Sequence, residues 1–219
     1  PMFPPGTLVI FSALGSAYWI LLLITMSFNF ATLFATLYLQ VLHGQAPIVA
    51  AYLSAAMSFS WTTAAVAVSG MQGRMVWFSI FTGVISIFLG AAVLAWGATS
   101  ASLLFPVVGL VFVGIGMGLT NGHLVALAIL AVPEGQESLA GSSVQTMRTL
   151  GIGFGAAAAG LFANAAGLAD AGIISNAKGE VRAEFPELVV AAVDWVHRGE
   201  MLLSAAAVAV TVVFFLRGR

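Results

Sequence analysis

The hydrophobic pattern consists of long apolar runs separated by short polar turns. Five of the runs reach the ~20 residues that an α-helix needs to cross the hydrocarbon core of a bilayer, and a sixth is shorter. The pattern predicts an all-α, polytopic membrane protein with six transmembrane helices, at 15–42, 48–69, 76–96, 103–132, 139–167 and 201–216.

Two segments lie outside the predicted spans. The first, 1–14, begins with the turn-rich letters PMFPPG, and we expect a linker or an entry segment at the membrane surface. The second, 168–199, holds most of the charged residues and is predicted to be an extracytoplasmic loop. Apolar residues recur at helical spacing over 184–195, which predicts an amphipathic helix on the membrane surface. Because the chain begins with Pro1 rather than methionine, we expect it to be a piece of a longer one.

The composition agrees with a position in the bilayer. Of the 219 residues, 61% are hydrophobic and 7% are charged, whereas about 25% are charged in a typical soluble domain. A net charge of −1 gives no reason to expect a nucleic-acid partner. The sequence has no cysteine, no phosphate-binding loop, no nucleophile elbow and no metal-ligand trio. We therefore expect neither an enzyme nor a metal or cofactor site.

Six spans would place both chain ends on the same side of the membrane. That side carries three arginines close to span ends: Arg74, Arg217 and Arg219. The other side carries the same number of basic residues, all in 168–199, together with five acidic ones. Because Arg148 lies nearer the first side, the positive-inside rule favours cytoplasmic termini.

The span 139–167 carries a single arginine, Arg148. A charge at the centre of a span costs roughly 2.5–3.5 kcal/mol on insertion scales, so we expect Arg148 to face protein rather than lipid. Gln145, Gly151 and Gly155 lie at helical spacing from it, and the two glycines form a GxxxG pair that lets a neighbouring helix approach closely. One interpretation gives Arg148 and Gln145 a gating or coupling role on a polar pathway. The alternative is that Arg148 satisfies carbonyl groups at a cytoplasmic helix end and binds nothing.

The fourth span contains a glycine ladder followed by two polar residues. Gly114, Gly118 and Gly122 form the pattern GxxxGxxxG, which indicates close helix packing. Asn121 and His123 should face inward, because lipid would leave their polar atoms unpaired. We expect Asn121 in a cavity wall and His123 in a coupling role that carries a proton. The alternative for His123 is a neutral ring that is hydrogen-bonded to a neighbouring helix.

A polar stripe runs along one face of the first span, and it consists of Asn29, Thr32, Thr36 and Gln40. A weaker stripe in the second span includes Trp61. The predicted substrate cavity is lined by six residues: Asn29, Phe30, Thr32, Thr36, Trp61 and Asn121. The alternative is interhelical hydrogen bonding without a cavity. No acidic residue lies in the first five spans, and Glu200 stands at the edge of the sixth, so ion coupling would fall to His123 and Arg148 or to an absent part of the chain.

The letters PEGQESLAGSSVQTMRTLGIGFGAAAAGLFANAAG, at 133–167, resemble the eleventh helix of major facilitator superfamily (MFS) transporters of the drug/proton antiporter branch. The similarity lies in a small-residue run, in Arg148 followed by Leu150 and Gly151, and in the glycines and alanines after them. The six-span pattern and the PMFPPGTL start extend the resemblance over nearly all of the chain. The turn 70–74 stands where that family has a short basic loop, but it lacks the acidic residue and most of the arginines.

This resemblance implies the C-terminal half of an MFS transporter, built as two inverted three-helix repeats. A substrate cavity would be shared with a missing N-terminal six-helix half. The first and fourth spans would line it, the fifth would face it from the cytoplasmic end, and the third and sixth would lie on the lipid side. The implied function is secondary active transport of a small organic solute or drug by alternating access, with proton-coupled export across a bacterial inner (plasma) membrane. No cofactor is implied.

Two other functions stay open at this point. One is a stand-alone six-helix half-transporter that acts as a homodimer, and the other is a non-transporting membrane scaffold subunit. An upstream reading frame with six more spans would favour the half of a larger transporter. A start methionine directly before Pro1 would favour the other two.

Overall fold

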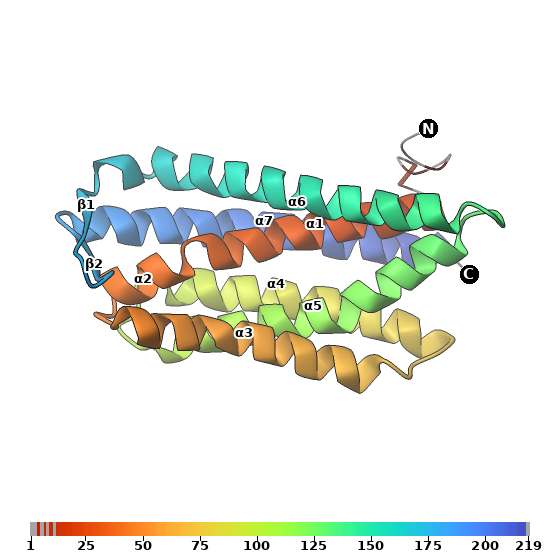
Figure 1. Cartoon of the computed structure of the whole chain (residues 1–219), viewed down its shortest axis with the longest axis horizontal. Coiled ribbons are helices and arrows are strands. Elements are labelled where there is room, and N and C mark those ends of the chain that lie inside the picture. The colour runs from red at the N-terminus through yellow and green to blue at the C-terminus, as the bar shows by residue number, and fades with distance from the viewer. Residues whose placement is uncertain (1–3, 5–6, 8, 11, 218–219) are drawn as a thin grey trace.

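Six long helices run side by side along the molecule in this computed structural model, which describes residues 4, 7, 9–10 and 12–217 (Figure 1). They are α1 (Ala13–Leu33), α3 (Pro47–Val68), α4 (Arg74–Gly97), α5 (Leu104–Leu130), α6 (Glu137–Ala165) and α7 (Pro186–Arg217). A short helix, α2 (Ala35–Val41), continues α1 after a break at Phe34. The predicted entry segment 1–14 lies mostly outside the described residues, and Arg219 lies outside them as well.

Local sequence signals account for several helix ends. The side chain of Ser12 accepts a hydrogen bond from the backbone nitrogen of Gly15 at 2.9 Å, which caps the first turn of α1. Pro47 and Pro186 are the first residues of α3 and α7, where the missing N–H of proline removes no intrahelical bond. Gly73 precedes α4 with φ at 57°, a left-handed conformation that favours glycine.

Five helical segments are long and apolar enough to cross a membrane: α1 with α2, α3, α4, α5 and α7. The predicted span 139–167 forms α6, which is just as long but falls outside this group. Its many glycine, serine and threonine residues, together with Arg148, lower its hydropathy. The fold is thus all-helical apart from one small hairpin, with five candidate membrane spans and a sixth long helix beside them.

The last helix corrects the sequence-based prediction. A surface helix at 184–195 and a separate span at 201–216 were expected, but α7 runs without a break over Pro186–Arg217. The helical spacing of its inward face continues past the predicted end, through Val196, Glu200 and Ser204, all of which are buried. The segment 168–199 is therefore not one loop, because its second half belongs to a helix that is long and apolar enough to cross a membrane.

The connection between α6 and α7 also contains two short strands that the sequence did not predict. After a 3-10 turn, η1 (Leu168–Asp170), strands β1 (Ile173–Ser175) and β2 (Val181–Ala183) pair in antiparallel fashion. The side chain of Asn176 closes their turn by accepting from the backbone nitrogens of Lys178 and Glu180, at 2.9 and 3.0 Å. We call this end of the bundle the hairpin end; α1 begins and α7 ends at the opposite end (Figure 1).

The helices pack around α1, α4 and α5. The most extensive contacts join α5 to α3 and to α4, α1 to α6 and to α7, α4 to α7, and α1 to α5. The main apolar core lies where α1 meets α4, α5 and α6, and includes Ile24, Ile87, Met117 and Met147. α3 and α6 lie apart on the outside of this arrangement (Figure 1).

Glycines set the spacing at two of these contacts. A Cβ atom added at Gly114 or Gly118 would fall against backbone carbonyls of α3, so α5 and α3 meet backbone to backbone. On α6, Gly151 and Gly155 face α1, where an added Cβ would come within 2.9 Å of Thr25 and 3.0 Å of Asn29. Gly122 differs, because no atom lies within 4 Å of the position its Cβ would take.

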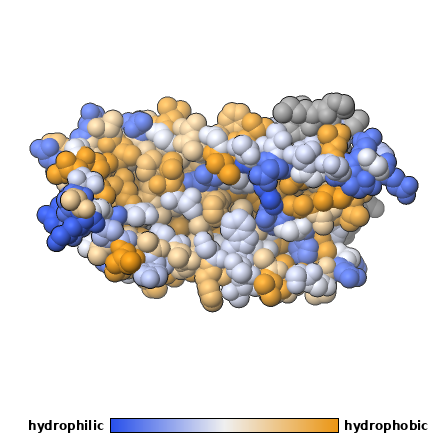
Figure 2. All heavy atoms as spheres, in the orientation of Figure 1, coloured by the Kyte–Doolittle hydropathy of each residue, from blue (hydrophilic) through white to orange (hydrophobic). Residues whose placement is uncertain are grey.

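The outer surface is apolar along the middle of the bundle. In the view of Figure 2, hydrophilic residues gather mainly at the two ends, and one smaller hydrophilic group interrupts the apolar middle. Large apolar side chains are exposed far from the helix ends, such as Phe59 (75% exposed), Phe154 (57%) and Leu202 (71%). An apolar surface of this extent fits an integral membrane protein, in which lipid covers these side chains.

Two glycines of α5 provide a matched test of the packing. We expect Gly118→Ala to lower the free energy of unfolding in detergent by about 1–3 kcal/mol, because the added methyl group overpacks the α3 contact. Gly122→Ala places the same methyl group in open space, so it should leave the thermal midpoint unchanged or raise it slightly. Equal melting curves for the two variants would contradict the close α3–α5 contact.

Candidate functional site

A cavity of about 730 Å³ lies between α3, α4 and α5, beside the turn that joins α3 to α4. Its walls include Trp61 and Val68 of α3, Trp77 of α4, and Asn121, His123 and Leu127 of α5. Ligand pockets are typically ~300–1,000 Å³ and mostly apolar, with a few polar groups that orient the ligand. The cavity has the size and the lining of a site for a small organic molecule.

The side chain of Arg148 reaches from α6 to this region of α5. Its Nη2 atom donates a hydrogen bond of 2.6 Å to Oδ1 of Asn121, and both residues are partly buried. Because α6 packs mainly against α1, this bond is a direct polar link from α6 to α5. The two ion pairs among the described residues lie elsewhere, on α7. The guanidinium group is thus bonded to a neutral amide, and its positive charge stays available to an anionic or polar ligand.

His123 occupies the same wall with an unused ring nitrogen. Its side chain is partly buried, and within the described part of the chain its Nε2 atom has no hydrogen-bond partner. A buried polar atom without a partner is unusual and calls for a ligand, a water molecule or a proton. The structure therefore brings Asn121, His123 and Trp61 together at one cavity, with Arg148 bonded to Asn121.

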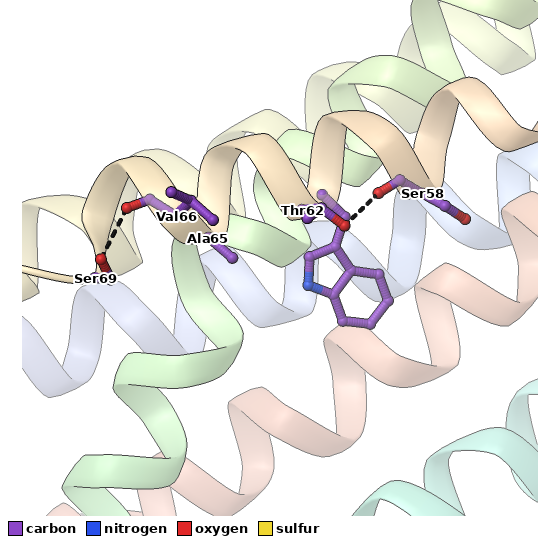
Figure 3. A pocket seen from close by; sticks show the side chains of 6 residues that line it. Ser58, Thr62, Ala65, Val66 and Ser69 are labelled. Atoms are coloured by element: carbon purple, nitrogen blue, oxygen red, sulfur yellow. Dashed lines mark hydrogen bonds between the residues drawn. The ribbon is translucent and has the colours of Figure 1, made fainter.

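A groove of about 430 Å³ continues from the cavity along α3 (Figure 3). It shares Trp61, Ala65 and Ser69 with the cavity. The hydroxyl groups of Thr62 and Ser69 donate to carbonyls of their own helix, at 3.0 and 2.9 Å, so they are already satisfied. The groove is consequently apolar in character, and its largest side chain, Trp61, meets Phe28 of α1 edge-on at 5.3 Å.

The polar stripe predicted on the first span does not converge on this cavity. Asn29 donates to the carbonyl of Thr25 at 2.9 Å and lies between α1 and α6, while Thr32 donates to the carbonyl of Phe28. Thr36 is exposed on α2. Phe30 is buried against Phe162 of α6, and Gln40 accepts a hydrogen bond from the backbone of Val181 in β2.

The remaining predicted site residues flank the cavity or the helix contacts. Gln145 is exposed on α6, one helical turn before Arg148. Gly122 lines the cavity, whereas Gly114, Gly118, Gly151 and Gly155 lie at the helix contacts described above. Within the described part of the chain, no group of three or more histidine, aspartate or glutamate residues is arranged to hold a metal ion.

Sequence reasoning missed one polar cluster, which lies between α7 and α1. Glu200 is fully buried, and its Oε2 atom lies 3.0 Å from Nδ1 of His197. Ser27 of α1 is the neighbouring hydroxyl. The signal was present, because the helical spacing at 185–196 extends to residue 200, but the charges near 194–200 were interpreted as the end of a loop.

Because the chain contains no cysteine, single cysteines can test whether the cavity holds water. Ala126→Cys lies in the lining, Ala128→Cys is buried on the same helix, and Ala205→Cys is exposed on the outside of α7. Thiols react as thiolates, which form in water and not in lipid. We expect a charged methanethiosulfonate reagent to label only Ala126→Cys in permeabilised vesicles; equal labelling of Ala205→Cys would mean that the outer face is wet too.

Comparisons with known proteins give no family for this chain, so a function can be argued only from the residues described above. No protein-family model matches the chain, and no curated protein matches it either.

Proposed function

We propose that this chain is the C-terminal half of an MFS-like secondary transporter that moves a small organic solute or drug by alternating access. The observation that carries the proposal is the cavity between α3, α4 and α5, which has Asn121 and His123 in its wall and Arg148 bonded to it from α6. In such a protein the cavity would open toward a second six-helix half, and substrate would bind between the two.

The packing of the helices supports two inverted three-helix repeats. The proposed repeats are α1, α3 and α4, followed by α5, α6 and α7. Exchanging α1 with α5, α3 with α6 and α4 with α7 converts the most extensive helix contacts into one another: α3–α5 becomes α6–α1, and α4–α5 becomes α7–α1. The contacts α4–α7 and α1–α5 map onto themselves. The glycine pairs follow the same exchange, because α5 presents glycines to α3 and α6 presents glycines to α1.

The side-chain chemistry supports an uncharged or amphipathic cargo. Two tryptophans, Trp61 and Trp77, offer flat apolar surfaces. Four polar, uncharged side chains belong to the described cavity walls: Ser69, Gln72, Asn121 and His123. Arg148 brings a positive charge to this site through its bond to Asn121, and Arg74 follows the lining residue Gly73 in the chain. We propose that Arg148 holds α6 against α5 through Asn121 in the present state and releases it when the transporter changes conformation.

We also propose that both termini are cytoplasmic in a bacterial inner membrane and that transport is proton-coupled export. An even number of long helices brings the start of α1 and the end of α7 to the same end of the bundle (Figure 1). Arg74 is exposed at that end, as the positive-inside rule favours for a cytoplasmic face.

Removal of the hydrogen bond between Arg148 of α6 and Asn121 of α5 tests the proposed transport function. In the full gene product, Arg148→Ala should reduce efflux of an uncharged amphipathic dye by roughly tenfold or more, since a charge-assisted hydrogen bond contributes ~1.5–3 kcal/mol. Membrane insertion and the amount of folded protein should not change. Arg182→Ala is the matched control, because that arginine is exposed on β2, far from the cavity, and should leave efflux intact.

Unchanged efflux in Arg148→Ala would assign Arg148 to a structural role. Absence of any dye or drug flux in the full protein, when it is reconstituted in vesicles with an imposed proton gradient, would argue against a proton-coupled drug exporter.

A further inference from the structure

An acid and a base lie buried together inside the bundle. Glu200 stands near the midpoint of α7, about 21 Å along the helix axis from Pro186 and about 26 Å from Arg217. It is 0% exposed, and His197, one turn earlier, is 5% exposed. The imidazole Nδ1 lies 3.0 Å from carboxyl oxygen Oε2, within hydrogen-bond distance. The other carboxyl oxygen, Oε1, has no hydrogen-bond partner among the described residues.

The surroundings of the pair contain one further polar group. Ser27 of α1, also 0% exposed, lies beside the Glu200 carboxyl group and interacts with it through its hydroxyl, which has no closely bonded partner among the described residues. Gly199 packs against the rings of Phe30 and Phe162, which meet edge-on at 5.9 Å and close off that side. The Ser27 hydroxyl and Oε1 of Glu200 therefore lie near each other in the interior, and neither has a closely bonded partner among the described residues.

No cation of the described residues compensates a negative charge at this place. Glu200 interacts electrostatically with His197 and has Ser27 as its other polar neighbour. The charged side chains of α7 are accounted for elsewhere: Arg198 donates to Asp194 at 2.7 Å, and Glu187 is exposed. The described parts of the elements packed against α7 carry few other ionisable groups. Tyr18 of α1 donates to the carbonyl of Ala140, Tyr38 of α2 donates to that of Gly97, and Arg148 of α6 donates to Asn121. The others are Glu137 of α6 and three exposed residues: Arg74 of α4, Asp170 of η1 and Arg182 of β2.

Binding of one proton removes the uncompensated negative charge of the pair. A carboxylate without a counter-charge in a low-dielectric interior is strongly unfavourable, so the pair needs a proton on either the carboxyl oxygen or the imidazole nitrogen. Binding it changes the net charge of the pair from −1 to 0, and the short nitrogen–oxygen distance lets both residues share it. A sodium or other hard metal ion fits poorly, because such ions require several oxygen ligands and a nitrogen occupies one side here.

The pair has a connection to the hairpin end of the bundle. His197 lines a small cavity of about 10 Å³ together with Tyr38, Leu94 and Leu110, which is roughly the space that one water molecule needs. The ring of Tyr38 meets that of His43 edge-on, with centroids 5.0 Å apart. His43 is partly exposed in the turn between α2 and α3, and its pKa is lowered because the effect of burial outweighs the opposing interaction with the backbone of Ala101. His197, Tyr38 and His43 thus follow one another from the buried pair toward the hairpin end, among apolar residues such as Leu94 and Leu110.

We propose that His197 and Glu200 form a proton-binding site inside the helical bundle, reached from the hairpin end past Tyr38 and His43. The site binds and releases one proton, which Glu200 and His197 share and which Ser27 stabilises by hydrogen bonding to the free carboxyl oxygen. Its use as the coupling site of a transporter rests on the function proposed above, whereas proton binding itself does not.

Infrared difference spectroscopy on the full protein in phosphatidylcholine vesicles tests the site directly. We expect a pH change to produce the carbonyl band of a buried carboxylic acid in the wild type, and Glu200→Gln to remove that band. Asp194→Asn is the matched control, because Asp194 lies on the same helix in a partly exposed pair with Arg198, and the band should persist. His197→Gln should move the pH midpoint of the band, since it removes the partner that shares the proton.

Loss of folding is monitored through helical circular dichroism, and Glu200→Asp then serves as the conservative variant that keeps a titrating carboxyl group. A wild type without any such band, or a band that survives Glu200→Gln, would overturn the proton site. A band assigned to Glu200 in a protein whose dye flux ignores the pH gradient would support the site and overturn the proposed proton coupling. Proton-coupled flux that persists in Glu200→Gln would overturn the coupling role of Glu200 alone.

Discussion

Hydrogen bonds between helix hydroxyls and the backbone of α5 depend on how closely the helices approach one another. Ser79 and Ser86 of α4 donate to the carbonyls of Leu119 and Phe112, at 2.8 and 2.7 Å. A side chain at Gly116, between those two carbonyls, would fall against the backbone of α4. Because lipid offers no alternative partner, these hydroxyls are satisfied only while the glycine contact is intact. Close packing of the helices around α5 and hydrogen bonding of these hydroxyl groups therefore depend on each other.

A few buried polar atoms have no such hydrogen bond, and they point to functional sites. Most serine and threonine hydroxyls of the described helices donate to a carbonyl of their own or a neighbouring helix. Six buried side-chain atoms of the described residues have no closely bonded partner, and three of them, on His123, Ser27 and Glu200, belong to the two sites described above. Such groups are costly for stability, and they are common where a protein exchanges a ligand or a proton.

The sequence predicted the long helices well, because apolar runs and Gly- or Pro-containing turns act locally. It failed at α7, where charges at 194–200 indicated a loop. In the structure these charges pair along the helix itself, Arg198 with Asp194 and His197 with Glu200, so they do not interrupt it. The cavity could be predicted only in part. The exclusion of polar groups from lipid predicted inward positions for Asn121 and His123, and both residues line the cavity. Phe30, which was predicted for the cavity wall, packs against Phe162 of α6 instead, because its neighbours are set by tertiary packing.

The two polar sites lie on different sides of α1, and that helix touches both. Toward α6, α1 contacts Gly151 and Gly155, within two turns of Arg148. Toward α7, it places Ser27 beside Glu200 and Phe30 against Gly199. The break at Phe34 separates this part of α1 from α2, which is tied to the hairpin through Gln40. A change of charge at Glu200 would alter what Ser27 bonds to, and any resulting shift of α1 would act on the glycine contact that positions α6. Coupling between the proton site and the Arg148–Asn121 link therefore requires no contact between them, only that α1 move as a unit up to its break.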